Sequence, residues 1–220
     1  MNPGPQVVGH LFGMESLPVT DTLIVSWVVV VFLIITAKII GSNLELVPNG
    51  IQNATELLLT AIEDQIEPML PGEGRKFLPF IGTIFIFVGV ANLSGVLPGV
   101  PNPTGDINTT LGLALLVFLI MHFEGMRENG VWGYIKGFAE PVFILLPLNI
   151  VSELAKPISH SFRLFGNIVG GGIIITLIYQ AAPWLVPIPL QAWFDIFIGI
   201  IQALIFGMVA IAYISVSKEG

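Results

Sequence analysis

The chain has 220 residues, of which 54% are hydrophobic and 10% charged, with a formal net charge of -7 and a mean hydropathy of +0.88. So few polar side chains cannot cover a globule with a wet surface, and the composition therefore indicates an integral membrane protein. The negative charge argues against nucleic acid as a partner, and the absence of cysteine excludes disulfides and thiolate-bound metals. We expect neither a cofactor nor a metal site.

Five apolar stretches are predicted to cross the membrane, which gives an all-α integral membrane protein with one membrane domain over residues 1–220. A span needs about 20 apolar residues to cross roughly 30 Å of hydrocarbon. The predicted segments are an outer N-terminal segment at 1–22, span 1 at 23–41, a cytoplasmic surface helix at 49–70, span 2 at 77–97, an outer loop at 98–110, span 3 at 111–126, a cytoplasmic loop at 127–140, a long tilted helix at 141–182 and a last span at 190–217.

The distribution of Lys and Arg predicts the orientation. If each stretch crosses once, six of the eight basic residues fall on one side, whereas 1–20, 98–110 and 181–190 contain none. As one helix, the long stretch would measure about 63 Å, twice the hydrocarbon thickness. Because splitting it into two spans would move Lys218 to the opposite side, we predict one strongly tilted helix, with the N-terminus outside and the C-terminus cytoplasmic.

The stretch 49–70 predicts an amphipathic helix on the membrane surface. Apolar residues recur there with helical spacing, and glutamates form a second stripe. Asn49 is expected to cap its N-terminus, and Pro68 marks its end. Because lipid-facing surface helices usually carry Lys and Arg, this acidic helix is either a lipid anchor or a platform for a protein partner.

The long helix carries a polar stripe around Arg163. A guanidinium stays charged, and placing one at the bilayer centre costs from about 3 to more than 10 kcal/mol. At 100° per residue, a set of polar residues and one glycine fall within a sector of roughly 120° that includes Arg163. The other members are Asn149, Ser152, Glu153, Lys156, Ser159, His160, Asn167 and Gly170. The stripe must face water, another helix or a moving ion site, whereas an arginine that snorkels to headgroups or pairs with Glu153 is the alternative.

Small and polar residues accompany this stripe in both of the last two helices. Gly166 and Gly170 lie on the same broad face as Arg163 and would let another helix approach it, although ordinary helix packing explains this spacing equally well. The last span places three residues at i, i+4 and i+7 on one face, namely Asp195, Gly199 and Gln202. Gln202 is deep enough to need polar partners, and we expect the Arg163 stripe beside it. Asp195 either belongs to the same site or is a solvated interfacial acid.

Three segments of the sequence resemble subunit a of F-type ATP synthases: ELAKPISHSFRLFGNIVGG, PNPTGDINTT and IQALIFGMVAIAYI. RLFGN is the strong signal, and the predicted topology agrees over essentially the whole chain. PTGDIN, which also predicts a capped turn before Leu111, is similar to the family's loop into the fourth helix. The resemblance implies that the long helix and the last span wrap against a rotating ring of c subunits, with Arg163 facing the ring carboxylates, Gln202 beside it, and Asn167 and Gly170 lining the ring-facing surface.

The resemblance also implies ion translocation rather than catalysis in this chain, which lacks a GxxxxGK[ST] nucleotide loop. An outer half-channel would be bounded by Asp195, and a cytoplasmic one would run near Asn149, Glu153 and His160, with Lys156 on the same stripe. The small residues expected to face the ring are Gly166, Gly170 and Gly199. The implied partners are the c-ring subunits, the peripheral-stalk b subunits, the F1 head and the lipid bilayer of a bacterial plasma membrane.

The coupling ion stays open between H+ and Na+. Many proton-translocating relatives carry a carboxylate or imidazole nine residues after the essential arginine, where this chain has Gly172. Asp195 could compensate, or the channel could conduct Na+, which needs water and oxygen ligands; a lysine at the position of Lys156 occurs in both kinds of relative. The competing class is a secondary transporter in which Arg163 holds a substrate carboxylate, and five spans without internal repeats argue against it.

Overall fold

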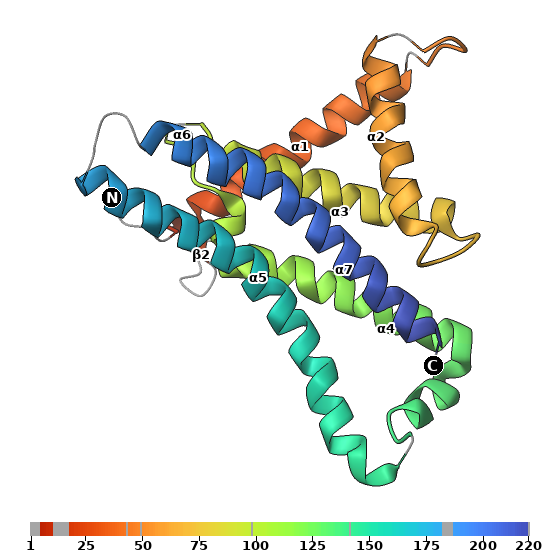
Figure 1. The fold of residues 1–220 in the computed structure, drawn as a ribbon. Coiled ribbons are helices and arrows are strands. Elements are labelled where there is room, and N and C mark those ends of the chain that lie inside the picture. The colour runs from red at the N-terminus through yellow and green to blue at the C-terminus, as the bar shows by residue number, and fades with distance from the viewer. Residues whose placement is uncertain are drawn as a thin grey trace.

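The computed structural model of the chain describes residues 5–10, 18–42, 44–48, 50–97, 99–140, 142–181 and 187–219. Within these residues the chain is almost entirely helical, and five helices are long and apolar enough to cross a membrane, which confirms the predicted fold class. The longer elements, drawn in Figure 1, are β1 (Val7–His10), β2 (Pro18–Thr20), α1 (Asp21–Ser42), α2 (Gly50–Ile66), α3 (Gly74–Ser94), α4 (Ile107–Gly137), α5 (Leu146–Ala181), α6 (Pro187–Ala192) and α7 (Gly199–Glu219).

The N-terminal part of the chain differs from the sequence-based expectation in two respects. The strands β1 and β2 form an antiparallel pair with Val7 opposite Thr20, and this pair was not predicted. The helix α2 ends at Ile66, two residues before the proline expected to mark its end. The expected cap residue Asn49, together with Pro141 and Ala182 at the ends of the predicted long helix, lies outside the described residues.

α4 extends further than predicted. The expected cytoplasmic loop at 127–140 is helical as far as Gly137, with a break at Gly130, where φ is 70° and ψ is 153°. A residue with a Cβ is strained at this positive φ, whereas glycine adopts it readily. Beyond the break the chain turns away from the axis of α4, as the darker green turns in Figure 1 show. We call residues 131–140 the α4 tail.

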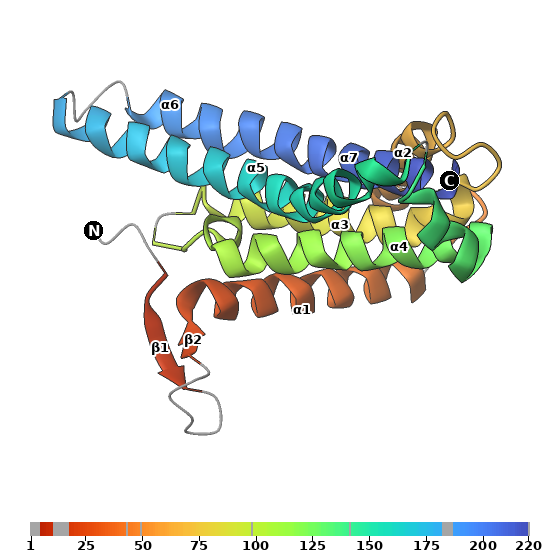
Figure 2. The same ribbon diagram turned by 90° about the horizontal axis from the view of Figure 1, so that it is seen from below.

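The core of the bundle lies between α3, α4 and α7, with the end of α2 packed against α3. In the long apolar window of α3, 44% of residues are buried, compared with 11% in α1. α1 therefore lies at the edge of the bundle, as Figure 2 shows, and most of its side chains face away from the other helices. The largest fully buried core side chains are Ile66, Ile81, Val88, Val117, Met121, Leu164, Ile211 and Ile214.

The ends of α1, α4 and α7 and the start of α3 lie at one end of the bundle (Figure 2), which we call the basic end. Lys76 Nζ lies 2.5 Å from Glu124 Oε2 and 3.1 Å from Glu73 Oε2, and Lys218 also pairs with Glu73. These ion pairs link α3, α4 and α7. The hydrogen bond from Lys218 holds the pKa of Glu73 below its ordinary value of 4.5, with a further hydrogen bond from Lys76. The basic residues of these segments are Lys38, Arg75, Lys76, Arg127, Lys136 and Lys218.

At the opposite end, Asp106 caps α4 and attaches it to α1. Its Oδ1 accepts a hydrogen bond from the Asn108 backbone N–H at 2.9 Å, which confirms the capped turn expected in PTGDIN. Its Oδ2 accepts a hydrogen bond from Thr22 Oγ1 at 2.7 Å, and both side chains are buried. Asp106 therefore fixes the first turn of α1 against the start of α4.

Asn92 ties three elements together at the same end. Its side chain is fully buried in α3, where Nδ2 donates to the Gly199 carbonyl of α7 at 2.8 Å. Its Oδ1 accepts from Thr104 Oγ1 at 2.5 Å, in the 3-10 turn Pro103–Gly105. Because both polar atoms of this amide have a partner, the network holds α7 in position against α3 and the loop before α4.

Candidate functional site

α5 is one continuous helix, preceded by a 3-10 turn at Phe143–Leu145, and not a hairpin. Its 36 residues correspond to about 54 Å. At 100° per residue, its buried positions centre roughly 110° away from Arg163, so the arginine lies outside the face that packs on the bundle. The buried residues of α5 are Pro157, His160, Ser161, Leu164, Gly171 and Ile175.

Arg163 is exposed on the outer face of α5. Among the residues that the structure describes, none forms a hydrogen bond or an ion pair with its guanidinium. Glu153, the partner considered from the sequence, pairs with Lys156 instead. A Cβ built on Gly166 or Gly170 would meet no atom within 4 Å, so the surface beside the arginine is open. Asn167 is exposed as well.

Two contacts fix the register between α5 and the last span, which run antiparallel (Figure 1). The His160 ring stacks on Phe206 with ring centroids 3.7 Å apart, and a Cβ on Gly171 would lie 2.9 Å from Phe194 Cδ1. These contacts are eleven residues apart on α5 and twelve residues apart on the last span. The additional residue is accommodated by the π-helical segment Trp193–Ile198, because a π-helix has more residues per turn than an α-helix.

This register brings the polar residues of the last span level with those of α5. Leu164 follows His160 by four residues, and Gln202 precedes Phe206 by four residues, so in these antiparallel helices the two lie at the same height along the bundle. The buried Gln202 is therefore level with Arg163, the residue before Leu164. The tight contact at Gly171 places the half-buried Asp195 near that glycine. Gln202 and the α5 stripe therefore lie at the same height, and no hydrogen bond joins them among the described residues.

Two expectations for the last span are wrong. The i, i+4, i+7 spacing of Asp195, Gly199 and Gln202 assumed a regular α-helix, whereas Trp193–Ile198 is π-helical and rotates Asp195 away from that face. Gly199 does not lie on an open surface: it is buried, and a Cβ there would lie 3.1 Å from Asn92 Cβ. Close packing of α7 against α3, not contact with another subunit, explains this glycine.

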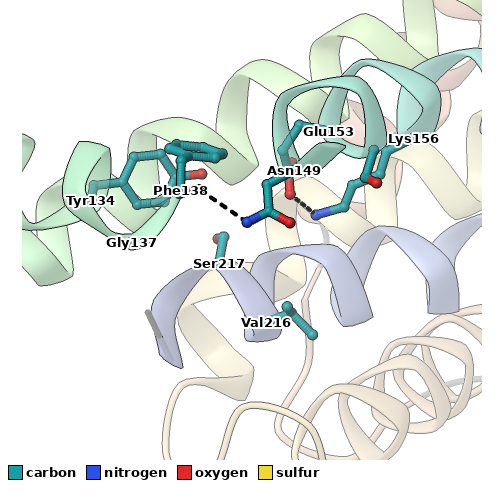
Figure 3. A pocket seen from close by; sticks show the side chains of 9 residues that line it. Tyr134, Gly137, Phe138, Asn149, Glu153, Lys156, Val216 and Ser217 are labelled. Atoms are coloured by element: carbon teal, nitrogen blue, oxygen red, sulfur yellow. Dashed lines mark hydrogen bonds and ion pairs between the residues drawn. The ribbon is translucent and has the colours of Figure 1, made fainter. Parts of the chain in front are cut away.

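A cavity of about 190 Å³ lies beside α5 toward the basic end. Figure 3 shows that Asn149, Glu153 and Lys156 project into it from α5, while other lining residues come from the α4 tail and α7. Asn149 Nδ2 donates to the Phe138 carbonyl at 2.9 Å, and Glu153 pairs with Lys156. Three predicted site residues are therefore brought together. The full lining is Tyr134, Gly137, Phe138, Asn149, Ser152, Glu153, Lys156, Val216 and Ser217.

Three side-chain polar atoms are buried without a hydrogen-bond partner in the described part of the chain, and all belong to α5. They are Glu153 Oε2 and both ring nitrogens of His160. Buried polar groups are nearly always paired with protein or with ordered water, so these atoms fit a solvated path. Glu153 and His160 are seven residues apart on one helical face, which directs such a path from the cavity toward the level of Gln202.

Sequence reasoning missed several residues around this site. Asn92 gave one signal, an isolated amide in an apolar span, which must find partners in hydrocarbon. Tyr134 gave none, because the predicted cytoplasmic loop carried no expectation of a contact with α5 or α7. The cavity lining contributed by Ser217 depends on long-range packing, which the local pattern does not reveal.

Five helices able to span a membrane, an arginine on an open helical face and a cavity that polar side chains enter define a multi-pass membrane protein whose arginine has no ion-pair partner in the described part of the chain. The sequence matches the family described as ATP synthase A chain over residues 23–215. The chain belongs to this family.

Relatives resemble the chain over most of its length. It is 42% identical over 214 residues to "ATP synthase subunit a 2" of a Bradyrhizobium species, covering 97% of this chain and 96% of that protein. It is 43% identical over 210 residues to the chloroplastic ATP synthase subunit a of Oedogonium cardiacum, covering 90% and 82%. It is 37% identical over 229 residues to a subunit a described as sodium ion specific, from Propionigenium modestum, covering 97% and 79%.

Proposed function

We propose that the chain is the stator subunit of the membrane motor of a rotary ATP synthase, where it forms two ion half-channels against a ring of c subunits. The observation that carries the proposal is Arg163, which is exposed within a membrane-spanning helix and has no ion-pair partner in the described chain. A permanent cation in hydrocarbon costs several kcal/mol, so a carboxylate outside this chain is needed to offset it. A ring of c subunits supplies carboxylates one after another.

Charge arithmetic then gives the rotation mechanism. A ring carboxylate that has lost its ion is stabilised by Arg163 as it passes, while an ion-loaded carboxylate is neutral and can move into lipid. Gly166 and Gly170 leave room for the ring helix to approach the guanidinium. The fixed positive charge repels cations at its own height and prevents direct leakage between the half-channels. An ion must therefore ride the ring nearly a full turn, which converts the ion gradient into torque.

The cavity at the basic end is assigned to the cytoplasmic half-channel. Asn149, Glu153 and Lys156 line it, and the unpaired ring nitrogens of His160 continue the polar path. A lone buried carboxylate would hold a passing cation tightly, and conduction requires binding weak enough for release. Lys156 pairs with Glu153 and so weakens this attraction while leaving Oε2 of the carboxylate without a partner.

The outer half-channel is assigned to the opposite end, between α5 and the last span. Asp195 is half-buried there, and its carboxylate would concentrate cations at the channel mouth. Gln202, at the level of Arg163, and the exposed Asn167 would receive the ion near the ring. The outer half-channel therefore ends at the level of Arg163, whose positive charge repels the ion.

Partners supply what this chain lacks. ATP chemistry belongs to the F1 head, the peripheral-stalk b subunits would hold the chain against the torque, and the ring carboxylates select H+ or Na+. The basic end is assigned to the cytoplasm of a bacterium, which places the N-terminus outside the plasma membrane. The likeness to a sodium-specific relative keeps Na+ among the ions that this path would serve.

Purification from native membranes discriminates this proposal from a self-contained secondary transporter that uses Arg163 as a substrate counter-charge. Co-isolation of the chain with a ring of small hairpin proteins and a nucleotide-binding head supports the motor. Isolation as a lone chain, followed by solute transport after reconstitution, would overturn it. The two outcomes are separable by composition before any transport is measured.

A further inference from the structure

The α4 tail is separated from the straight part of α4 by a break and is held in place by contacts of its own. Gly130, with its positive φ, ends the straight part of α4, and the tail folds back toward α5 and α7. Its far end is fixed from α5, because Asn149 Nδ2 donates to the carbonyls of Phe138 at 2.9 Å and Glu140 at 3.4 Å. The tail therefore packs between two helices without belonging to the regular bundle.

One hydrogen bond holds the middle of the tail against α4. His122 Nδ1 and Tyr134 Oη lie 2.6 Å apart, and the two rings meet edge to face with centroids 5.8 Å apart. The Tyr134 ring presses so closely on α4 that a Cβ on Gly125 would lie 2.5 Å from Tyr134 Cε2. Phe138 also packs edge to face on Tyr134, with centroids 5.2 Å apart. The glycine makes room for the tyrosine, and the histidine fixes its hydroxyl.

The position of Tyr134 decides the shape of the space beside α5. Tyr134, Gly137 and Phe138 form one wall of the 190 Å³ cavity, opposite Asn149 and Glu153. Figure 3 shows Tyr134 and Phe138 on one side of this space and the α5 side chains on the other. Phe138 also lines a second, mainly apolar cavity of about 240 Å³ between α4 and α5. A shift of the tail would alter both cavities at once.

We propose that the His122–Tyr134 hydrogen bond is a latch that keeps this wall in place, which makes the two side chains positioning residues for ion access from the cytoplasm. The inference rests on the assignment of the cavity to the cytoplasmic half-channel. Neither ring needs to touch the ion, because the bond holds the tyrosine against Gly125 as one wall of the cavity that Glu153 also lines. Without the bond, the tail moves between positions and the cavity loses its fixed width.

The test uses the whole complex. Because this chain has no natural cysteine, a single cysteine can be placed in the lining of the cavity. Ser217→Cys, at a buried position of the lining, reports how fast a water-soluble thiol reagent reaches the cavity from the cytoplasmic side. Tyr134→Phe removes the hydroxyl while keeping the ring, and should raise the labelling rate about five-fold, the factor that corresponds to a loss of about 1 kcal/mol for one hydrogen bond. The matched control is Tyr179→Phe, whose hydroxyl lies 3.5 Å from Gln191 on an exposed surface. It should leave the labelling unchanged.

Two further measurements separate a latch from general loosening. A cysteine at the exposed Asn53 of α2 should label at the same rate with and without Tyr134→Phe. In the chain that keeps Tyr134, His122→Asn places a polar atom near the position of Nδ1 and should keep labelling slow, whereas His122→Leu should raise the labelling rate as Tyr134→Phe does. The same vesicles should show ATP-driven ion uptake reduced by a factor of about two to five in Tyr134→Phe and near normal in His122→Asn.

The labelling and uptake measurements can each overturn the proposal. Unchanged labelling of Ser217→Cys in Tyr134→Phe overturns the latch, and this readout does not depend on pumping. Faster labelling with normal ion uptake overturns the claim that the wall sets ion access. In both cases the tests of Arg163 stand unaffected, so failure of the latch is distinguishable from failure of the proposed function.

Discussion

Replacing Asn92 by leucine should loosen the last span where it passes Arg163. The substitution keeps a similar branched shape but removes the donor to the Gly199 carbonyl and the acceptor for Thr104, both in a fully buried place. Each buried polar group left without a partner costs about 1–3 kcal/mol, and Thr104 retains a second acceptor on Asn102 at 2.6 Å. We therefore expect Asn92→Leu to destabilise the chain by about 1–3 kcal/mol.

The assay is the thermal unfolding of the purified complex, followed by loss of helical signal. For a chain of this size, about 1 kcal/mol shifts the transition by roughly 2–4 °C, so Asn92→Leu should lower it by roughly 2–12 °C. Asn53→Leu, at an exposed site on α2, is the matched control and should shift it little. Thr104→Val should cost less, and combining it with Asn92→Leu should cost less than the two separately, because they share one bond. An Asn92→Leu complex as stable as the Asn53→Leu complex would refute the role of this network.

Three further predictions concern the ion path and the basic end. Asp195→Asn should slow ATP synthesis most at low external ion concentration, and titration against external Na+ and pH separates cation attraction from a proton relay, which would shift the pH optimum; an unchanged rate everywhere would make Asp195 a solvated acid. A cysteine at the exposed Asn167 should crosslink to one near the ring carboxylate, whereas one at the buried Leu164 should crosslink much less, and equal yields would remove the ring-facing geometry. Because the pKa of Glu73 is lowered in the fold, its ion pair with Lys218 adds stability that is complete above about pH 4.5 and is lost as the pH falls through the lowered pKa. Glu73→Gln should therefore reduce stability at neutral pH and flatten its loss in acid, and an unchanged acid unfolding curve would contradict this role.

The sequence was sufficient for the membrane fold because composition and charge placement act over whole segments. Lys218 alone decided between one long helix and a hairpin, since the basic residues had to share a side. Arg163 stood out because a guanidinium has no inexpensive place in hydrocarbon. The sequence alone therefore predicts a structural feature when every other arrangement would carry a large free-energy cost.

Other features depend on which surface a residue meets, and local pattern does not determine that. Gly199 could serve close packing within the chain or contact with another subunit, and only the position of Asn92 decides. The π-helical segment around Asp195 inserts one residue into a regular period, which a fixed angle of 100° per residue misses. The break at Gly130 did have a local signal, because Asn-Gly is a turn dipeptide within an otherwise helical stretch.

The central claim is that Arg163 supplies the fixed positive charge against which the ring turns, and ATP-driven ion pumping by reconstituted complexes tests it most directly. Arg163→Ala should abolish pumping while the complex still assembles, and Arg163→Lys should restore little, because an ammonium lacks the planar fork that pairs with successive carboxylates. Arg75→Ala is the matched control, since the Arg75 side chain is 93% exposed at the basic end, and it should pump normally. Coupled pumping at the wild-type rate by vesicles that contain the Arg163→Ala complex would contradict the account.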